Sequence, residues 1–393
     1  MNDLISKSAS ELIDLIKSRT VSPVEVAEAY LNRIGKLNPV LNAIVTIAPD
    51  VLEKAREAEA AIMRGESVGA LHGLPLTVKD TIETANLRTT SGCRLRADHV
   101  PISDAPSVAR LKAAGAIILG KSNAAEMAMD YTADNPVFGR TNNPFDLSRT
   151  PGGSSGGEAA AITTCMSPAG LGSDLAGSIR IPSHLCGIVG LKPGTGRVPG
   201  AGQFPPSSGP YSLGAVIGPM ARTVGDVRVL FRALTGNDSQ WASSVTDFTS
   251  DRSRIVGQRV AWYSDDRVAP VSDETRQAVE KAAKALSDAG LVVDERLPPG
   301  IERGHELWLK MFSRASVIQL REVYAGHEEQ GGAFVRWRLT TAEDHPVPNL
   351  DQYISAWMER DILRLALDEW MTEIPLLVAP VGATPALKHD TLK

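Results

Sequence analysis

The sequence is poor in cysteine and has no long apolar run. Its 393 residues contain three cysteines, Cys93, Cys165 and Cys186, an odd number at spacings that do not resemble a metal site. We therefore expect buried thiols in a reducing compartment. No stretch of about 18 apolar residues is present, and residues 1–13 lack the apolar core of a signal peptide. These absences predict a cytoplasmic, soluble protein without a membrane partner.

Long blocks of positive charge are also missing. The 41 Lys and Arg residues are outnumbered by 46 Asp and Glu, which gives a formal net charge of −5 and none of the footprint of a nucleic-acid binder. The seven histidines are scattered and form no metal-binding pattern such as H-E-x-x-H. We therefore expect no nucleic-acid partner and no metal. The 43% hydrophobic content is sufficient for a large globular core.

The first 67 residues are predicted to form a helical cover. Ser8 with Glu11, and Ser22 with Glu25, each match a capping box, and apolar residues follow both at helical spacing. Residues 50–64 predict a third helix, rich in Ala and Glu. These helices should pack on the segment that follows.

From Leu74 onward, short apolar runs alternate with helical patterns. This alternation predicts an α/β layered fold with a largely parallel, buried sheet. The Ser-, Thr- and Asp-rich residues 236–256 predict a surface excursion. The expected strands are 74–78, 116–119, 188–191, 259–263, 291–293 and 375–378, and the expected helices are 105–114, 156–166, 224–234 and 272–289.

Two familiar motifs are matched in the sequence, but the expected secondary structure around each match does not fit the motif. Residues 115–122 fit the phosphate-loop pattern G-x-x-x-x-G-K-[ST], but that loop needs an open turn after a strand, and here the four middle residues are themselves the expected strand. Residues 152–156 fit the G-x-S-x-G nucleophile elbow, which needs an apolar strand before it and a His after it. His345 and His389 are available, but residues 146–151 predict a loop.

Three further segments carry the chemistry. Lys79 ends an apolar strand, Ser154 lies between glycine pairs, and Ser178 follows Gly177 just before an expected short helix over about 179–185. Glycine pairs inside an α/β pattern are typical of a backbone that closely approaches another segment or a ligand, or that adopts a conformation closed to other residues. The N–H groups at a helix start favour a developing oxyanion. The segments are L-P-L-T-V-K-D from Leu74, P-G-G-S-S-G-G-E from Pro151 and G-S-D-L-A-G-S-I-R-I-P from Gly172.

Taken together, these segments resemble the amidase-signature family. The 24-residue spacing from Ser154 to Ser178 is typical of the family, and Ile217–Val224 also resembles it. The resemblance covers about residues 70–235. It implies a Ser–cisSer–Lys triad in which Ser178 is the nucleophile, Ser154 follows a cis peptide bond and relays the proton, and Lys79 is the base. A lysine base must be neutral, and burial can lower its pKa from about 10.4.

The resemblance also implies an oxyanion hole from the backbone N–H groups of Leu175, Ala176 and Gly177, with that of Ser178. The family usually has glycine where this chain has Ala176, and a positive φ at an alanine would be strained. Family members normally continue beyond the position of Lys393 with further strands. We therefore expect the family's final segment to be missing from the sequence.

The fold implied by the resemblance is an α/β/α sandwich with a large mixed β-sheet and an N-terminal helical cover. We expect a single amidase-signature domain over residues 1–393. It would comprise the helical cover at 1–67, the signature core at 68–235 and a C-terminal half at 236–393. No organic cofactor is implied.

The function implied is hydrolysis of amides and anilides, and also of aryl esters or carbamates (urethanes), through an acyl-enzyme on Ser178. We expect an enzyme that resembles aryl acylamidases or urethanases, acting as a monomer or homodimer on small neutral substrates. The alternative is the amidase subunit of a tRNA-dependent amidotransferase, which works inside a complex and releases ammonia from glutamine. A non-catalytic scaffold is disfavoured because all three triad positions are intact.

The predicted substrate pocket is apolar. Ile181 stands where the amidotransferase relatives commonly carry glutamine, and by analogy Met127, Met129 and Tyr131 should line the approach to Ser154. An apolar wall leaves the charged groups of free glutamine unpaired, which costs several kcal/mol. The alternative for Ile181 is simple core packing behind the helix.

Overall fold

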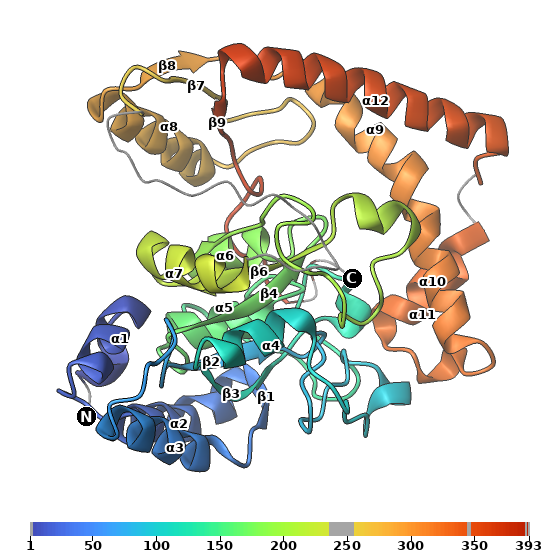
Figure 1. Cartoon of the computed structure of the whole chain (residues 1–393). Helices are drawn as coiled ribbons and strands as arrows, with labels where there is room; N and C mark the ends of the chain where they lie inside the picture. The colour runs from blue at the N-terminus through green and yellow to red at the C-terminus, as the bar shows by residue number, and fades with distance from the viewer. Residues whose placement is uncertain (1–2, 236–254, 344–346, 390, 392–393) are drawn as a thin grey trace. The chain divides into compact units, whose positions relative to one another are not determined.

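The structure, a computed structural model, describes residues 3–235, 255–343, 347–389 and 391 (Figure 1). These residues form two compact units. The first unit comprises the chain up to residue 235, the segment Tyr324–Trp337 and the described residues after 385. The second unit comprises the remaining described residues between 255 and 385. The expected single domain over 1–393 stays a prediction, and of the expected excursion at 236–256 only the last two residues are described.

The first unit is built on a six-stranded mixed sheet in the order β1-β3-β2-β4-β6-β5. Strands β3, β2 and β4 are mutually parallel at its centre, whereas β1, β6 and β5 join by antiparallel pairing. This confirms the predicted α/β fold with a mixed sheet. The strands are β1 (Ile44–Ile47), β2 (Pro75–Lys79), β3 (Ile117–Ser122), β4 (Ala169–Asp174), β5 (Val189–Gly190) and β6 (Val216–Ala221).

Helices cover both faces of this sheet. The capping boxes predicted at Ser8 and Ser22 are both present at the starts of α1 and α2, and α2 packs beside α3 (Figure 1). The helices of the first unit are α1 (Ala9–Lys17), α2 (Pro23–Leu41), α3 (Val51–Met63), α4 (Pro106–Ala113), α5 (Gly156–Thr163), α6 (Arg180–Cys186) and α7 (Val224–Leu234). Shorter turns are η1 (Leu4–Ser6), η2 (Arg94–Arg96), η3 (Glu126–Ala128), η4 (Gly209–Leu213) and η8 (Glu328–Gln330).

Alternation along β2 separates the apolar core from the polar site. Leu76 and Val78 pack into the main hydrophobic cluster with side chains of α1, α3, α4 and α7. Because successive strand residues point to opposite faces, Thr77 and Lys79 point to the other face. Thr77 meets Glu158 of α5 there. The same strand therefore anchors one core layer and delivers a lysine to the opposite layer.

The second unit has a parallel three-stranded sheet in the order β8-β7-β9, against which α8 packs. The strands are β7 (Arg259–Trp262), β8 (Val292–Glu295) and β9 (Leu376–Val378). The helices are α8 (Asp273–Asp288), α9 (Gly304–Trp308) and α12 (Leu350–Glu373), with a π-helical stretch at Leu309–Ser313 and turns η6 (Ile301–Arg303) and η9 (Thr341–Glu343). Helices α10 (Arg314–Tyr324) and α11 (Ala333–Thr340) connect to the segment assigned to the first unit. Over the described ranges of both units, no helix is long and apolar enough to cross a membrane.

The sequence missed three strands of the larger sheet. All six expected strands are present, with ends shifted by at most three residues, but β1, β4 and β6 were not predicted. Of these, β4 matters most for the site because its last two residues, Ser173 and Asp174, lie among the candidate catalytic groups.

Candidate active site

Lys79 is the last residue of β2 and its side chain is completely buried. Its Nζ lies 2.6 Å from Ser154 Oγ and 3.0 Å from Ser173 Oγ. Two of the three predicted triad residues, Lys79 and Ser154, are thus in direct hydrogen-bond contact. The second partner of Lys79, Ser173, is not one of the predicted triad residues; its hydroxyl accepts a hydrogen bond from the amine and holds the orientation of that group.

Burial lowers the pKa of Lys79 from 10.5 to about 7. The main cause is the loss of hydration of the ammonium group, which Asp174 and Glu158 oppose through their negative charges. A lysine with such a pKa is largely neutral in weakly alkaline solution, where its lone pair can accept a proton. Lys79 therefore has the character of a general base.

Ser154 is held by a close approach of two backbone segments. The Gly153–Ser154 peptide bond is cis, as the resemblance implied. A side chain at Gly153 would collide with Thr132, since an added Cβ would lie 2.1 Å from its carbonyl oxygen. Ala125 N–H donates to the Ser154 carbonyl at 3.2 Å. The glycine before Ser154 is therefore required by contact with the loop around residues 125–132.

Ser178 lies in the turn that joins β4 to α6, and Asp174 organises this turn. The Asp174 carboxylate accepts hydrogen bonds from the N–H groups of Gly177 and Ile179 and pairs with Arg180 at 2.8 Å. Burial alone would raise the pKa of Asp174, but Arg180 and these N–H groups lower it overall. A permanently ionised Asp174 thus fixes the backbone on either side of Ser178.

The segments that carry Ser154 and Ser178 are adjacent. Ser155 N–H donates to the Ser178 carbonyl at 3.1 Å. Ser178 is 9% exposed, whereas Ser154 and Lys79 are 0% exposed. Of the three residues Ser178 is thus the most exposed to solvent, which is compatible with a nucleophile that must reach a substrate. The roles of the three residues stay a proposal.

The oxyanion loop accommodates Ala176 without the strain that the sequence suggested. The positive φ in this turn falls on Gly177, at 123°, and Ala176 is not among the positive-φ residues of the described chain. However, the Gly177 N–H is already bonded to Asp174. The oxyanion hole predicted from Leu175, Ala176 and Gly177 stays a prediction, and for Gly177 it requires that N–H group to be shared.

Two of the predicted pocket residues flank the nucleophile turn. Tyr131 is 44% exposed, and its hydroxyl donates to the Ala176 carbonyl at 3.2 Å. An added Cβ at Gly177 would meet Ile181 at 2.6 Å and Tyr131 at 3.9 Å. Met127 is completely buried in η3, so it supports the loop from inside. Met129 follows it and is partly exposed, and its place in the pocket stays a prediction.

The residues that sequence reasoning left without a role are Ser173, Asp174 and Glu158. The first two lay within the quoted motif around Ser178, and Glu158 closed the motif around Ser154. The sequence feature that could have identified Glu158 is its place within a run of small residues. A carboxylate within a run of small residues that form a buried helix needs a polar partner, and it has two, Thr77 and Ser122.

Neither of the two rejected motifs forms the site they would imply. Residues 117–122 of the phosphate-loop match are the buried strand β3. No strand leads into the Ser154 motif, since residues 147–153 form turns and loop with one isolated β-bridge, at Arg149. His389 is tied through its backbone to Ser148, and His345 lies outside the described residues. The group in contact with Ser154 is an amine, Lys79.

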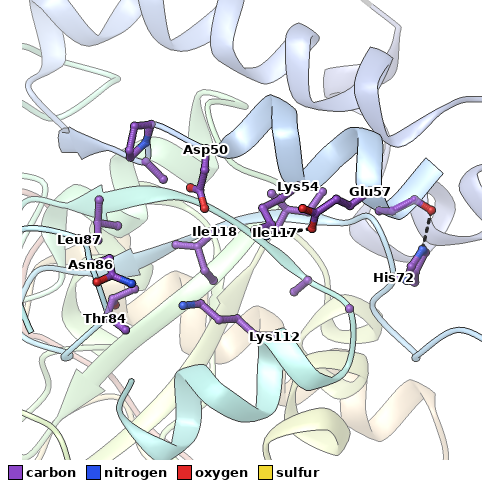
Figure 2. A pocket seen from close by; sticks show the side chains of 16 residues that line it. Asp50, Lys54, Glu57, His72, Thr84, Asn86, Leu87, Lys112, Ile117 and Ile118 are labelled. Atoms are coloured by element: carbon purple, nitrogen blue, oxygen red, sulfur yellow. Dashed lines mark hydrogen bonds and ion pairs between the residues drawn. The ribbon is translucent and has the colours of Figure 1, made fainter. Parts of the chain in front are cut away.

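A cavity of about 620 Å³ lies elsewhere in the first unit. Figure 2 shows side chains that reach it from α3, β3 and α4, among them Lys54, Ile118 and Lys112. Its lining includes none of the predicted triad residues. The candidate site is therefore at the buried amine and hydroxyls, because these groups can take part in catalysis. The volume of a cavity does not by itself indicate a catalytic site.

Side chains that could bind a metal are dispersed through the described chain. Within 3–235, 255–343 and 347–389, no group of three or more His, Cys, Asp or Glu side chains could hold a metal ion. The cysteines Cys93 and Cys186 are buried, Cys165 is partly buried, and all three are free. The cofactor-free chemistry expected from the sequence stays a prediction.

The amidase family model matches residues 25–393. A glutamyl-tRNA(Gln) amidotransferase subunit from Carboxydothermus hydrogenoformans is 33% identical over 98% of this chain and 84% of its own length. The corresponding protein from Sulfurihydrogenibium sp. is 38% identical, but the match spans only 75% of this chain and 61% of that relative. Among solved structures, a bacterial aryl acylamidase of the amidase-signature enzymes is 29% identical, with a TM-score of 0.86 over 98% of this chain and 81% of its own.

Proposed function

This chain belongs to the amidase family, and we propose that it hydrolyses amide-type bonds through an acyl-enzyme on Ser178. The observation that carries the proposal is the 2.6 Å contact between the buried Lys79 amine and the Ser154 hydroxyl. A buried amine of lowered pKa beside a hydroxyl is a base with a proton to take, and Ser178 lies on the neighbouring segment.

The proposed reaction uses the three side chains as one relay. Neutral Lys79 accepts the proton of Ser154, Ser154 accepts the proton of Ser178, and the Ser178 oxygen attacks the substrate carbonyl. When the C–N bond breaks, the same relay returns the proton to the leaving amine. Water then attacks the acyl-enzyme and releases the acid, so that an amide and one water give one acid and one amine. Backbone N–H groups of the turn from Leu175 to Ser178 would stabilise the oxyanion.

The preferred substrates are proposed to be small neutral amides or anilides, and also aryl esters or carbamates. Tyr131 and Ile181 flank the turn at Gly177 and offer an aromatic and an aliphatic surface. The cation beside the nucleophile, Arg180, is already paired with Asp174. Apolar contact contributes about 25 cal/mol for each Å² covered, whereas the charged ends of glutamine would find no partner in Tyr131 or Ile181.

A second candidate is the amidase subunit of an amidotransferase that takes ammonia from glutamine. It is favoured by the names of the two amidotransferase relatives and by their 33% and 38% identity to this chain. The two candidates differ in substrate and in dependence on a partner. A small neutral substrate, action as a monomer or homodimer, and a cytoplasmic location all belong to the first candidate and remain proposals.

Steady-state kinetics on a substrate panel would separate the candidates. The purified chain should show a higher kcat/KM for an aryl amide than for glutamine, with aryl esters and carbamates measured alongside. Ile181→Gln is the matched variant, because it adds one polar group at the edge of the turn. A preference of the isolated wild-type chain for glutamine would overturn the apolar pocket. Activity on glutamine that appears only with a co-purified partner would support the second candidate.

A further inference from the structure

Glu158 carries a completely buried carboxyl group and lies on α5, the helix that begins directly after Ser154 and Ser155. It accepts hydrogen bonds from the hydroxyls of Thr77 on β2 and Ser122 on β3, the latter at 2.6 Å. Thr77 lies two residues before Lys79 on the same face of β2, and Ser122 is the register partner of Lys79. Glu158 therefore links the end of β2, which carries Lys79, to the end of β3.

The fold leaves room for this carboxyl group at one glycine. Gly170 lies on β4 opposite Thr77. A Cβ at Gly170 would stand 1.9 Å from Glu158 Oε1 and 2.5 Å from the Thr77 carbonyl. Any side chain larger than hydrogen would occupy the space of the carboxylate. The absence of a side chain at Gly170 thus serves the placement of Glu158.

The charged groups around Glu158 are few and mostly positive. Lys79 on β2 and Lys121 on β3 are both completely buried, and both interact electrostatically with it. Lys121 is also bonded to Thr84 and interacts electrostatically with Asp80, Glu83 and Asp104. On α6, Arg180 is paired with Asp174, His184 is exposed, and the buried thiol of Cys186 has a raised pKa. Strands β1 and β6 contain no titratable residue.

We propose that Glu158 is a positioning residue for the base: its carboxyl group orients the Lys79 strand and places a titratable negative charge that controls the Lys79 amine. This inference rests on the proposed function, since it assumes that neutral Lys79 is the working base. An ionised Glu158 stabilises protonated Lys79, which cannot act as a base. A neutral Glu158 favours the neutral amine, which can.

The direction of the coupling follows from the charges. Burial raises the pKa of Glu158 to about 7, against the opposing effects of Ser122, Thr77 and the two lysines. Each of the two groups stabilises the charged form of the other: Glu158 raises the pKa of Lys79, and Lys79 lowers the pKa of Glu158. Removing the charge of Glu158 destabilises protonated Lys79, so the base loses its proton at a lower pH.

The test is the pH profile of kcat/KM for Glu158→Gln, which keeps the size and one hydrogen-bonding oxygen of the side chain. The midpoint of the acid limb should move down by about half a pH unit or more, because one buried unit charge has been removed. Glu158→Asp retains the charge, and its midpoint should return toward that of the wild type even if kcat is reduced. A lower kcat with an unmoved midpoint in Glu158→Gln would overturn the charge role.

Two further variants keep the test decisive. Asp226→Asn is the matched control, because Asp226 is also completely buried but bonds to Ser10 at the start of α1, and its midpoint should not move. If Glu158→Gln does not fold, Thr77→Val removes one hydrogen bond to the ionised carboxylate and should shift the midpoint downward by a smaller amount. An unmoved midpoint in folded Thr77→Val would then count against the proposal. Turnover that persists in Ser178→Ala would instead show failure of the proposed function.

Discussion

The Nζ atom of Lys79 lies 2.6 Å from the Oγ atom of Ser154, and neither side chain is exposed to solvent. An ammonium group in this place loses the stabilisation that water gives it. Two serine hydroxyls and the negative charges of Asp174 and Glu158 replace only part of that stabilisation. The neutral amine is therefore favoured near pH 7. This single contact explains how a lysine, which is normally protonated, can serve as a base.

Replacing Lys79 by methionine should remove activity without weakening the fold. Methionine has a similar length and no amine, so the relay loses its base while the buried volume is kept. We expect kcat to fall on the order of 10²–10⁴-fold, and the free energy of unfolding to stay the same or rise, because a buried polar group is gone. Steady-state kinetics and urea denaturation measure the two effects. Near-normal turnover in folded Lys79→Met would exclude the base role.

The wild-type rate should rise with pH through about 7 and then level off. The pKa of Lys79 is lowered to about 7 by burial, and the base is active only when deprotonated, so activity is lost as the pH falls below this value. The measurement is kcat/KM for a neutral amide between pH 5 and 10. Maximal activity near pH 5 with a loss above pH 7 would contradict a lysine base.

Ser154→Ala and Ser178→Ala should each be severely impaired, and the double variant should be little worse than Ser178→Ala alone. Residues that act as a unit are strongly non-additive, and loss of such a nucleophile costs on the order of 10⁶ in rate where it has been measured. Kinetics of the two single variants and the double variant form the required cycle. Additive losses would show that the two serines act independently.

Apolar runs identified β2 and β3 as strands, although β1, which reads Ile-Val-Thr-Ile, was missed. β2 and β3 are completely buried and read as Pro-Leu-Thr-Val-Lys and Ile-Ile-Leu-Gly-Lys-Ser. β4 was missed because it reads Ala-Gly-Leu-Gly-Ser-Asp, with no β-branched or aromatic residue. It forms a strand by pairing with β2 and β6, and its small residues leave room for neighbouring groups, as Gly170 does for Glu158. The strand propensity of a segment does not depend on contacts with residues that are distant in the sequence, so it cannot predict them.

β6 was missed for a related reason. It contains Gly218 and Pro219, which normally argue against a strand. Pro219 nevertheless pairs opposite Leu171 of β4, and its carbonyl accepts from Leu191 N–H. The triad was implied by the resemblance of its local glycine and serine motifs to the family, and the roles of its residues stay a prediction. The supporting groups Ser173 and Glu158 acquire their roles only through contacts made across the sheet.

Gly170→Ala should destabilise the fold, and Gly35→Ala should not. The added methyl group at Gly170 would meet Glu158 and Thr77 well inside contact distance, whereas nothing lies within 4 Å of the corresponding position at Gly35. Overpacking of a tight core costs about 1–3 kcal/mol or more. Alanine in the middle of α2 should add about 0.5–1 kcal/mol of stability. Denaturant unfolding of both variants gives the comparison. Equal stability of the two variants would mean that the Gly170 site is not tightly packed.

The covalent intermediate offers the most direct test of nucleophilic catalysis. The purified chain should be mixed with an activated aryl ester or carbamate, quenched in acid and examined by intact-protein and peptide mass spectrometry. We expect the mass of one acyl group, located on Ser178, and no adduct in Ser178→Ala. An adduct on Ser154, on a histidine or on no single residue of an actively turning-over enzyme would contradict nucleophilic catalysis by Ser178.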